Sequence, residues 1–335
     1  MTASGAGTDA RGAPRPAGSP EVSFVVIAYN EARHVRATVD SILAQEDLEA
    51  FEVVVVDDGS TDATADVVEA IARDRPEVRL VRHDANRGRG AARASGVAAA
   101  DGRWIAMVDA DILLPARWWR TCREKLADHD AVGGTAVPDG DVAYVHRRYR
   151  LEPKVRGATT IVTGNNGAYL GEAIRTVTFD AALSEGEDVA INHALRSAGY
   201  RLTGIEGLVV EHQESKGFAA SLRWLFVSGV GATRQLWRYR QVRPPDVAFA
   251  GFALVPVVTR RRPGLAIASV LAYALLAAAA HLAGRFRLDP RRPAALLAAV
   301  ATDSLLLLAY FAGRAFGVVV LVRPRGAPAG RAGEP

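Results

Sequence analysis

The chain has 335 residues, of which 49% are hydrophobic and 23% are charged. That length suffices for one large domain or two ordinary ones, and the composition argues against a disordered, collagen-like or disulfide-stapled chain. The single cysteine, Cys122, cannot form an intrachain disulfide, so the fold needs no oxidising compartment. The net charge of +4 conceals a split, because residues 216–335 carry 17 basic and 4 acidic residues whereas residues 1–215 carry 24 and 33. Since the basic part is also the apolar part, it favours anionic lipid head groups as partners over nucleic acid.

The first strands are indicated by short apolar runs that begin after a tail. Residues 1–20 contain no apolar run and are predicted to be a disordered tail, since a signal peptide needs a hydrophobic stretch. The apolar runs that follow predict four strands, at Val22–Ala28, Phe51–Val56, Val78–Arg82 and Arg103–Val108.

The stretches between these strands predict helices. Asn30 is expected to cap the first helix, and the turn Asp57–Asp62 to precede a second helix that ends near Arg73. The first helix has an apolar face made of Val35, Val39, Ile42 and Leu43. An Ala-rich third helix follows a Gly/Arg loop, and Pro115 suits the first turn of the fourth. This alternation predicts an α/β fold, a mostly parallel sheet flanked by helices that binds ligands at the carboxyl ends of its strands.

The second half of this domain is less regular in sequence. A helix is expected after Gly186 and a strand near Arg201–Val210, which would complete the sheet and form the second wall of a cleft. The expected boundaries are a catalytic domain at 21–215, amphipathic interfacial helices at 216–245, membrane segments at 246–323 and a tail at 324–335.

Apolar stretches in the last third predict membrane contact. Residues 264–284 contain no formal charge and are long enough to cross a hydrocarbon core of about 30 Å. A second span is expected at about 295–322, in an apolar stretch interrupted by Asp303 and Arg314. Residues 247–258 are shorter and are interpreted as interfacial or re-entrant, and Leu222–Tyr239 mixes aromatic and Arg residues as a surface helix does. Arginines flank both ends of the first span, so they do not determine its orientation.

Acidic residues follow two of the predicted strands. Asp57 and Asp58 end the second strand; a carboxylate there can accept hydrogen bonds from a nucleotide, and we assign that role to Asp58. Ser60 and Asp62 are interpreted as turn and capping residues instead. The pattern Asp109-Ala110-Asp111 ends the fourth strand and offers the hard oxygen ligands that Mg²⁺ or Mn²⁺ prefers.

Three further features are candidates for the same site. Arg93, in the Gly-rich segment after the third strand, is either a nucleotide contact or a solvated helix residue. One acid near Glu187-Asp188 is a candidate general base, although acids there also suit a helix N-terminus. His212, near the end of the last apolar strand, is either structural or a metal ligand.

Five motifs in this order resemble family 2 of the inverting glycosyltransferases, over about residues 22–215. The resemblance lies in Ile27–Glu31, Val56–Asp62, Asn86–Arg93, Asp109–Asp111 and Glu187–Asp188. It implies the GT-A fold, in which a nucleotide-binding half is joined to an acceptor-binding half.

The resemblance also implies roles for single residues. Those expected to bind the nucleotide are Ala28, Tyr29, Glu31, Asp58, Arg93 and Asp109. Asp111 would hold the divalent metal, Mn²⁺ or Mg²⁺, with His212 as a further ligand, and Asp188 would be the catalytic base. The donor and acceptor pocket would include Gly164, Asn165, Asn166 and Glu187.

Together these features predict a membrane-anchored enzyme that moves a sugar from a nucleoside-diphosphate sugar to an acceptor hydroxyl, with inversion. The membrane segments suggest a lipid-linked or cell-envelope acceptor, and the nucleotide-sugar donor suggests a multi-pass protein of the cell membrane with a cytoplasmic catalytic domain. Processive members carry Gln-x-x-Arg-Trp, whereas this chain has Ala220 before Arg223-Trp224, which argues against a polymer-extruding synthase. Two alternatives are a nucleotidyltransferase on a related sheet and a membrane scaffold that has lost catalysis. The first should show a Gly-rich loop after the first strand, and the second should lack Asp111 or Asp188.

Overall fold

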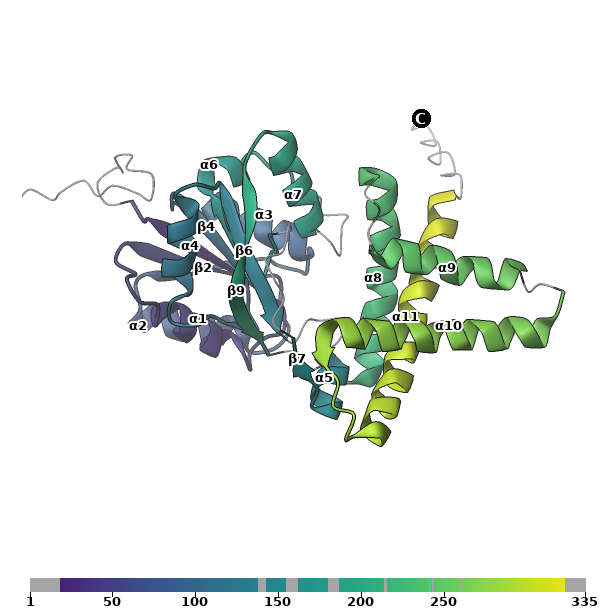
Figure 1. Cartoon of the computed structure of the whole chain (residues 1–335). Helices are drawn as coiled ribbons and strands as arrows, with labels where there is room; N and C mark the ends of the chain where they lie inside the picture. Colours follow the sequence, from purple (N-terminus) through teal and green to yellow (C-terminus); the bar gives the residue numbers. More distant parts are fainter. Residues whose placement is uncertain are drawn as a thin grey trace, which may run out of the picture.

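The computed structural model describes residues 19–137, 143–154, 162–179, 187–213, 216–240, 242, 244–258 and 261–322. Figure 1 shows an α/β domain beside a group of long helices. The tails at 1–18 and 323–335, and part of the Gly186 region, lie outside the described residues. The domain boundaries given above stay predictions.

The predicted parallel half of the sheet is confirmed. It contains the strands β1 (Val22–Ala28), β2 (Phe51–Asp57), β3 (Val78–Arg82) and β4 (Trp104–Asp109). They lie in the order β3-β2-β1-β4, and each neighbouring pair is parallel. Their apolar side chains are buried because helices cover both faces of a parallel sheet.

The other half of the sheet is mixed. Its strands are β5 (Ile112–Leu113), β6 (Ala131–Val137), β8 (Asn166–Leu170) and β9 (Leu202–His212). The eight-stranded order continues β4-β8-β6-β9-β5; the β6–β9 pair is parallel and the other new pairs are antiparallel. The expected strand near Arg201–Val210 is β9.

Helices flank this sheet as expected. They are α1 (Val35–Leu43), α2 (Thr64–Asp74), α3 (Arg89–Ala99), α4 (Trp118–Leu126), α6 (Gly171–Ile174) and α7 (Glu187–Ser197). The apolar face predicted for α1 packs against the core, with Leu43 partly buried there. Two expected helix starts are wrong. Asn30 adopts a left-handed conformation (φ +58°) in the loop before α1, and Pro115 precedes α4 by a turn, accepting a hydrogen bond from the Trp118 amide (2.9 Å).

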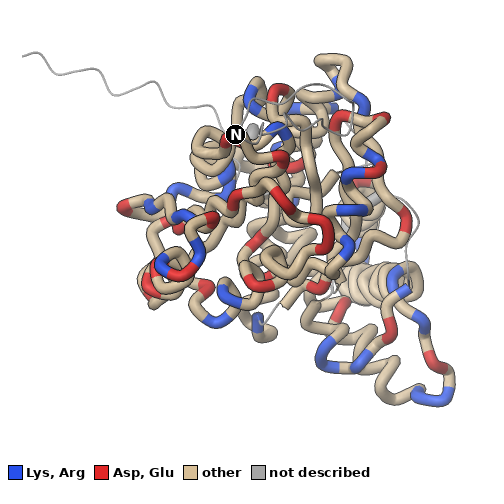
Figure 2. Tube along the Cα trace, turned by 90° about the vertical axis from the view of Figure 1, so that its left-hand side faces the viewer, with Lys and Arg blue, Asp and Glu red and all other residues tan. Residues whose placement is uncertain are grey.

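The C-terminal part consists of α8 (Phe218–Tyr239), α9 (Pro244–Val258), α10 (Pro263–Arg285) and α11 (Pro293–Val322). By length and composition alone, α10 and α11 could each cross a membrane. Figure 2 shows acidic and basic residues interspersed along the trace.

A second hydrophobic core joins this part to the α/β domain. The helix α5 (Ala143–Tyr149) contributes Val145, which packs with Leu225, Leu282 and Leu306 of the long helices. The short strand β7 (Glu152–Pro153) pairs with β10 (Phe286–Arg287). Residues 143–153 therefore lie within the expected catalytic range of the sequence but pack in space against the C-terminal helices.

Candidate active site

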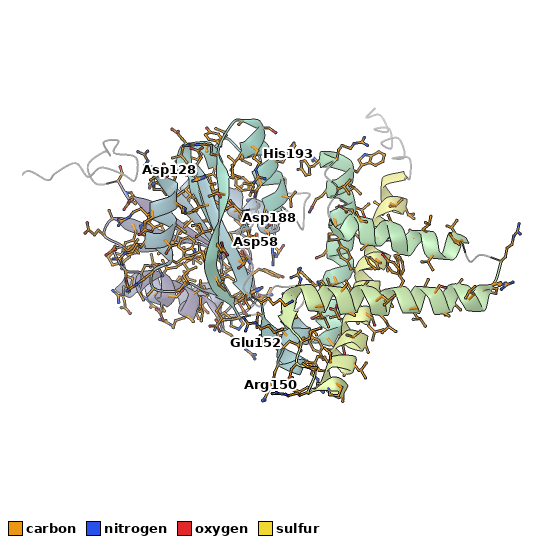
Figure 3. All side chains as sticks on the ribbon, viewed as in Figure 1. Asp58, Asp128, Arg150, Glu152, Asp188 and His193 are labelled. Atoms are coloured by element: carbon orange, nitrogen blue, oxygen red, sulfur yellow. The ribbon has the colours of Figure 1, made fainter. Side chains whose placement is uncertain are left out.

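The carboxyl ends of β1, β2 and β4 lie side by side at one edge of the sheet. The register places Ala28 opposite Asp57, and Ile27 opposite Asp109. The acidic strand ends predicted from the sequence are therefore neighbours in space. In Figure 3, Asp58 and Asp188 lie on the side of the sheet that faces α8, whereas Asp128 lies on the opposite side of the domain.

The segment after β1 is fixed to the turn after β2. The Asn30 carboxamide oxygen accepts a hydrogen bond from the Thr61 amide (2.8 Å), and the Asn30 amide donates to the Ser60 hydroxyl (2.9 Å). Asp62 accepts from the Thr64 amide in the first turn of α2 (3.0 Å), which confirms its turn role. Tyr29, which directly precedes Asn30, has a side chain that is 45% exposed. The phenol thus projects from a rigid loop.

Asp58 is engaged by the chain itself. Its carboxylate accepts hydrogen bonds from the amides of Arg87 (2.9 Å) and Gly88 (2.8 Å), and it pairs with His83 Nδ1 (2.6 Å). The other ring nitrogen of His83 lies 2.9 Å from the Ser95 hydroxyl. These contacts use most of the capacity of the buried Asp58 carboxylate to accept hydrogen bonds. The structure thus gives Asp58 a role in holding the loop before α3, and its contact with a nucleotide stays a prediction.

Arg93 is a buried residue that bridges two carboxylates, and it is not a solvated helix residue. Its guanidinium donates to Asp109 (2.8 Å) and to Glu187 (3.0 Å), and the side chain is only 2% exposed. Gly164 lies against the guanidinium, where a Cβ atom would be 2.7 Å from it. Burial alone would lower the pKa of Arg93, but Asp109 and Glu187 raise it, so the group stays charged. The bridge ties the end of β4 to the start of α7.

Asp111 and His212 meet across the pairing of β5 with β9. Ile112 lies opposite His212 in that pairing, which brings the Asp111 carboxylate to 3.0 Å from His212 Nε2. Burial of Asp111 would raise its pKa, but the hydrogen bond and charge of His212, with Arg89 and Lys216, lower it. The structure thus brings together the two residues predicted to share a metal.

Two cations near Asp111 were missed by the sequence analysis as site residues. Arg89 is the first residue of α3, and Lys216 precedes α8; both act electrostatically on Asp111. Lys216 also acts on Glu31, whose pKa is raised by burial and by Asp111, while His34 opposes the shift. Two sequence features could have indicated these residues. Arg89 lies in the Gly-rich segment, and Lys216 closely follows His212.

Asp188 lies in the first turn of α7, beside the Arg93 bridge. One of its carboxylate oxygens accepts a hydrogen bond from the Val189 amide (2.8 Å). Its charge acts on Arg93 and, after the larger effect of burial, raises the pKa of Tyr169. Asn192 donates to the Asp188 carbonyl (2.7 Å) and so fixes the start of the helix. Its role as the base stays a prediction.

Two of the residues expected in the donor and acceptor pocket, Asn166 and Glu187, are bonded within the chain itself. Asn166 is fully buried: Trp118 Nε1 donates to its side-chain oxygen (2.6 Å), and its amide donates to the Thr135 carbonyl (3.1 Å). These partners use the polar atoms of Asn166 to join β8 to its neighbours, and its role in a pocket stays a prediction. Glu187 is likewise held by Arg93. Asn165 lies in the turn between Gly164 and Asn166, partly exposed.

The donor set fits a divalent cation that is held mainly by its substrate. Among the described residues, no group of three or more His, Cys, Asp or Glu side chains could hold a metal alone. Asp111 and His212 offer one carboxylate and one imidazole. Mg²⁺ and Mn²⁺ commonly take few ligands from the protein and complete their shell with phosphate oxygens and water. The pair is therefore compatible with such a site.

Comparison with known proteins covers the part of the candidate site that lies before Glu187. Residues 23–180 match the family model described as Glycosyl transferase family 2. These residues are therefore similar to the family 2 glycosyltransferases. Within curated relatives, the chain is 53% identical to the succinoglycan biosynthesis protein ExoO of Rhizobium meliloti over 92 residues, 28% of this chain and 26% of that protein. It is 32% identical to the dolichyl-phosphate beta-glucosyltransferase ALG5C of Trichomonas vaginalis over 130 residues, 37% of this chain and 39% of that protein. The match thus spans less than two fifths of each relative.

The likeness to one solved structure covers most of this chain. The mannosyltransferase PcManGT from Pyrobaculum calidifontis, in complex with GDP-Man and Mn²⁺, is 26% identical. The likeness covers 87% of this chain and 87% of that one, with a TM-score of 0.54. The GT-A fold expected from the motifs is confirmed.

Proposed function

We propose that this chain is a membrane-attached, inverting glycosyltransferase that moves a sugar from a nucleoside-diphosphate sugar to an acceptor hydroxyl. The observation that carries the proposal is that buried Arg93 holds Asp109 and Glu187, the neighbour of Asp188, while Asp111 pairs with His212. Residues 23–180 of the same chain match the family 2 model. Loss of catalysis would more naturally remove one of these acids, so their presence favours an enzyme over a scaffold.

The residues of this site suit a single displacement. Asp188 would accept the proton of the acceptor hydroxyl while that oxygen attacks the anomeric carbon from the face opposite the leaving group. Arg89 and Lys216 supply positive charge near Asp111, where the diphosphate would leave. A divalent cation held by Asp111 and His212 would add Lewis-acid stabilisation of the leaving phosphate. No enzyme nucleophile is required, because one displacement inverts the anomeric centre.

The donor is best sought among the common nucleotide sugars, starting with GDP-mannose. PcManGT, which resembles this chain over most of its length, was solved with GDP-Man and Mn²⁺. The two long apolar helices support attachment to the cell membrane, with the catalytic domain in the cytoplasm where nucleotide sugars are made. That attachment would favour a lipid-linked or envelope acceptor by raising its local concentration. Ala220 in place of Gln supports non-processive transfer.

The test is donor binding and hydrolysis by the purified full-length protein. The panel contains UDP-, GDP- and dTDP-sugars, with and without Mn²⁺, for the unchanged chain, Asp111→Ala and Asp188→Asn. We expect one nucleotide sugar to bind in a metal-dependent manner and Asp111→Ala to lose that dependence. Asp188→Asn should keep binding but lose turnover by about 10²–10⁴-fold, the usual contribution of a general base.

A matched control separates these effects from general damage. Asp128 is exposed on the far side of the domain, so Asp128→Asn should bind and turn over the donor as the unchanged chain does. The proposal fails if no nucleotide sugar binds under any metal condition. The assignment of the base fails if Asp188→Asn turns over normally.

A further inference from the structure

The side chain of Asn192 joins the start of α7 to the segment that leads into β8. It is 2% exposed and lies one helical turn after Asp188. Its amide nitrogen donates to the carbonyls of Val162 and Asp188, both at 2.7 Å. Its oxygen accepts a hydrogen bond from the Val162 amide (2.9 Å). Asn192 therefore pairs with both backbone groups of Val162, as a residue of a neighbouring strand can.

These bonds explain why a polar residue occupies the buried face of α7. Three other residues on that helix, Val189, Ile191 and Leu195, are buried and apolar. Burying an amide is unfavourable unless it is hydrogen-bonded, and here both of its N–H groups and its oxygen have partners. The position therefore serves the bonds that the carboxamide makes and not apolar packing alone.

The partner of Asn192 is itself firmly held. The Val162 side chain is fully buried, and a Cβ atom added at Gly133 or Gly167 would lie 2.9 or 2.6 Å from it. Those two glycines belong to β6 and β8. The Val162 carbonyl also accepts a hydrogen bond from the Tyr169 hydroxyl (3.2 Å). Val162 is thus fixed to the sheet, and Asn192 fixes α7 to Val162.

The turn that follows Val162 carries two residues expected in the donor and acceptor pocket, Gly164 and Asn165. Thr163 pairs with Asn166 across this turn. The turn therefore starts one residue after the contact with Asn192, and the same contact that holds α7 also holds one side of the expected pocket.

A second connection joins the same two parts. A Cβ atom at Gly164 would lie 2.7 Å from the Arg93 guanidinium, so the turn rests on that group. Arg93 donates to Glu187 (3.0 Å), which directly precedes Asp188. The turn and the start of α7 are therefore linked twice, through Arg93 and through Asn192. Two links fix the position of Asp188 relative to the turn more closely than one link can.

We propose that Asn192 is a positioning residue that holds the base, Asp188, in place relative to the turn at 163–166. The proposal rests on the function proposed above, in which Asp188 is the base and the turn lines the donor and acceptor pocket. A general base must lie within hydrogen-bond reach of the proton that it removes. Asn192 acts through Asp188 and the turn, and it makes no bond to the ends of β1, β2 and β4, where the nucleotide would bind.

Donor binding and donor hydrolysis by the purified full-length protein test this role. The probe is GDP-mannose with Mn²⁺, or the sugar of the panel above that binds in its place, and water is the acceptor. We expect Asn192→Ala to lower kcat about 100-fold, because misplacing a reacting group by about 1 Å has a cost of that size. The affinity for the donor should be unchanged.

The matched control is Gln45→Ala, which removes a buried amide with the same bonding pattern. Gln45 is 7% exposed, and its amide donates to the carbonyls of Ser41 (3.0 Å) and Pro115 (2.9 Å). Its oxygen accepts a hydrogen bond from the Trp119 amide (2.9 Å). None of these partners is a predicted site residue. Gln45→Ala should therefore lower the thermal unfolding temperature as Asn192→Ala does, but keep kcat.

Two further variants separate positioning from a structural role. In the Asp188→Asn background, Asn192→Ala should cause little further loss of kcat, because it acts through Asp188. A structural role alone would lower kcat by the same factor in both backgrounds. Asn192→Asp keeps the size of the side chain and an acceptor oxygen for Val162 but loses both donors. It should also lower kcat with donor binding retained, and it provides the test if Asn192→Ala does not fold.

The positioning role is overturned if Asn192→Ala, or Asn192→Asp in its place, hydrolyses the donor at the unchanged rate. It is also overturned if the loss is equal with and without Asp188, or if Gln45→Ala loses kcat as strongly. The proposed function fails separately, and this role with it, if the unchanged chain binds no nucleotide sugar. Normal turnover by Asp188→Asn would instead remove the base through which Asn192 is proposed to act.

Discussion

At the scale of single residues, the active site depends on one buried guanidinium. Arg93 holds Asp109 and Glu187, which come from elements far apart in the sequence, and Asp188 follows Glu187 directly. A buried carboxylate left without its cation is strongly unfavourable. We therefore propose that Arg93 is a positioning residue, which would act on the reaction through Asp188 and Asp109.

We expect Arg93→Lys to lower kcat strongly with a much smaller change in KM for the donor. An ammonium cannot donate to two carboxylates with the planar geometry of a guanidinium, and misplacing a reacting group by about 1 Å costs about 100-fold in rate. Steady-state kinetics on the purified protein measures this change. Glu187→Gln keeps a side-chain oxygen that can accept the hydrogen bond from Arg93. It should therefore retain more activity than Glu187→Ala.

The control for this prediction is Arg73→Lys, at an exposed position of α2. It should leave both kinetic constants unchanged. An unchanged kcat for Arg93→Lys, accompanied only by lower stability, would show that the bridge has no role in catalysis.

At the scale of elements, the pairing of α8 with α11 depends on small residues. The Gly229 and Gly313 positions leave no room for a side chain, because each faces a backbone carbonyl of the other helix. Close approach of this kind is what permits extensive van der Waals contact between helices. Two long helices that hydropathy treats separately thus form one packed unit.

Gly313→Ala should lower the free energy of unfolding by about 1–3 kcal/mol, the usual cost of overpacking. The matched variant Gly284→Ala adds the same methyl group to α10, where nothing lies within 4 Å. It should be neutral or slightly stabilising, because Ala favours a helix over Gly. Thermal unfolding in the same detergent compares the two. Equal stability of both variants would contradict the close packing described here.

At the scale of the whole molecule, the second core attaches the catalytic domain firmly to its helices. The Tyr149 hydroxyl lies 2.6 Å from that of Thr302, and the Lys154 amide donates to the Arg285 carbonyl (2.8 Å). The candidate active site is therefore held at a fixed position relative to the long apolar helices. A lipid-borne acceptor would meet it by diffusing in two dimensions.

Surface dilution should therefore slow transfer to a lipid-borne acceptor. In this experiment the amounts of protein and acceptor are constant, the acceptor is subsaturating, and the total lipid of the vesicles is raised tenfold. We expect the transfer rate to fall about tenfold, because the effective concentration of the acceptor in the membrane sets that rate. Hydrolysis of the donor, which is soluble, should not change. A transfer rate independent of lipid amount would contradict a membrane-borne acceptor.

Much of the first half was predictable because its signals are local. The apolar runs of β1 to β4 are long enough to specify buried parallel strands, and parallel strands bring their acidic ends to one edge. The pairing of Asp111 with His212 was suggested by chemistry and is confirmed as a contact. The cap expected at Asn30 was wrong because the loop turns there to bind Thr61, a partner 31 residues away.

The sequence by itself determined the α/β order, the family motifs and the positions of the long apolar helices, since each depends on neighbouring residues. Only the tertiary structure decided what Asn166 and Arg93 contact, because their partners lie on other strands and helices. It also decided that α11 follows α8. Hydropathy measures how apolar a helix is, but its direction depends on packing, here on glycines that let two backbones meet.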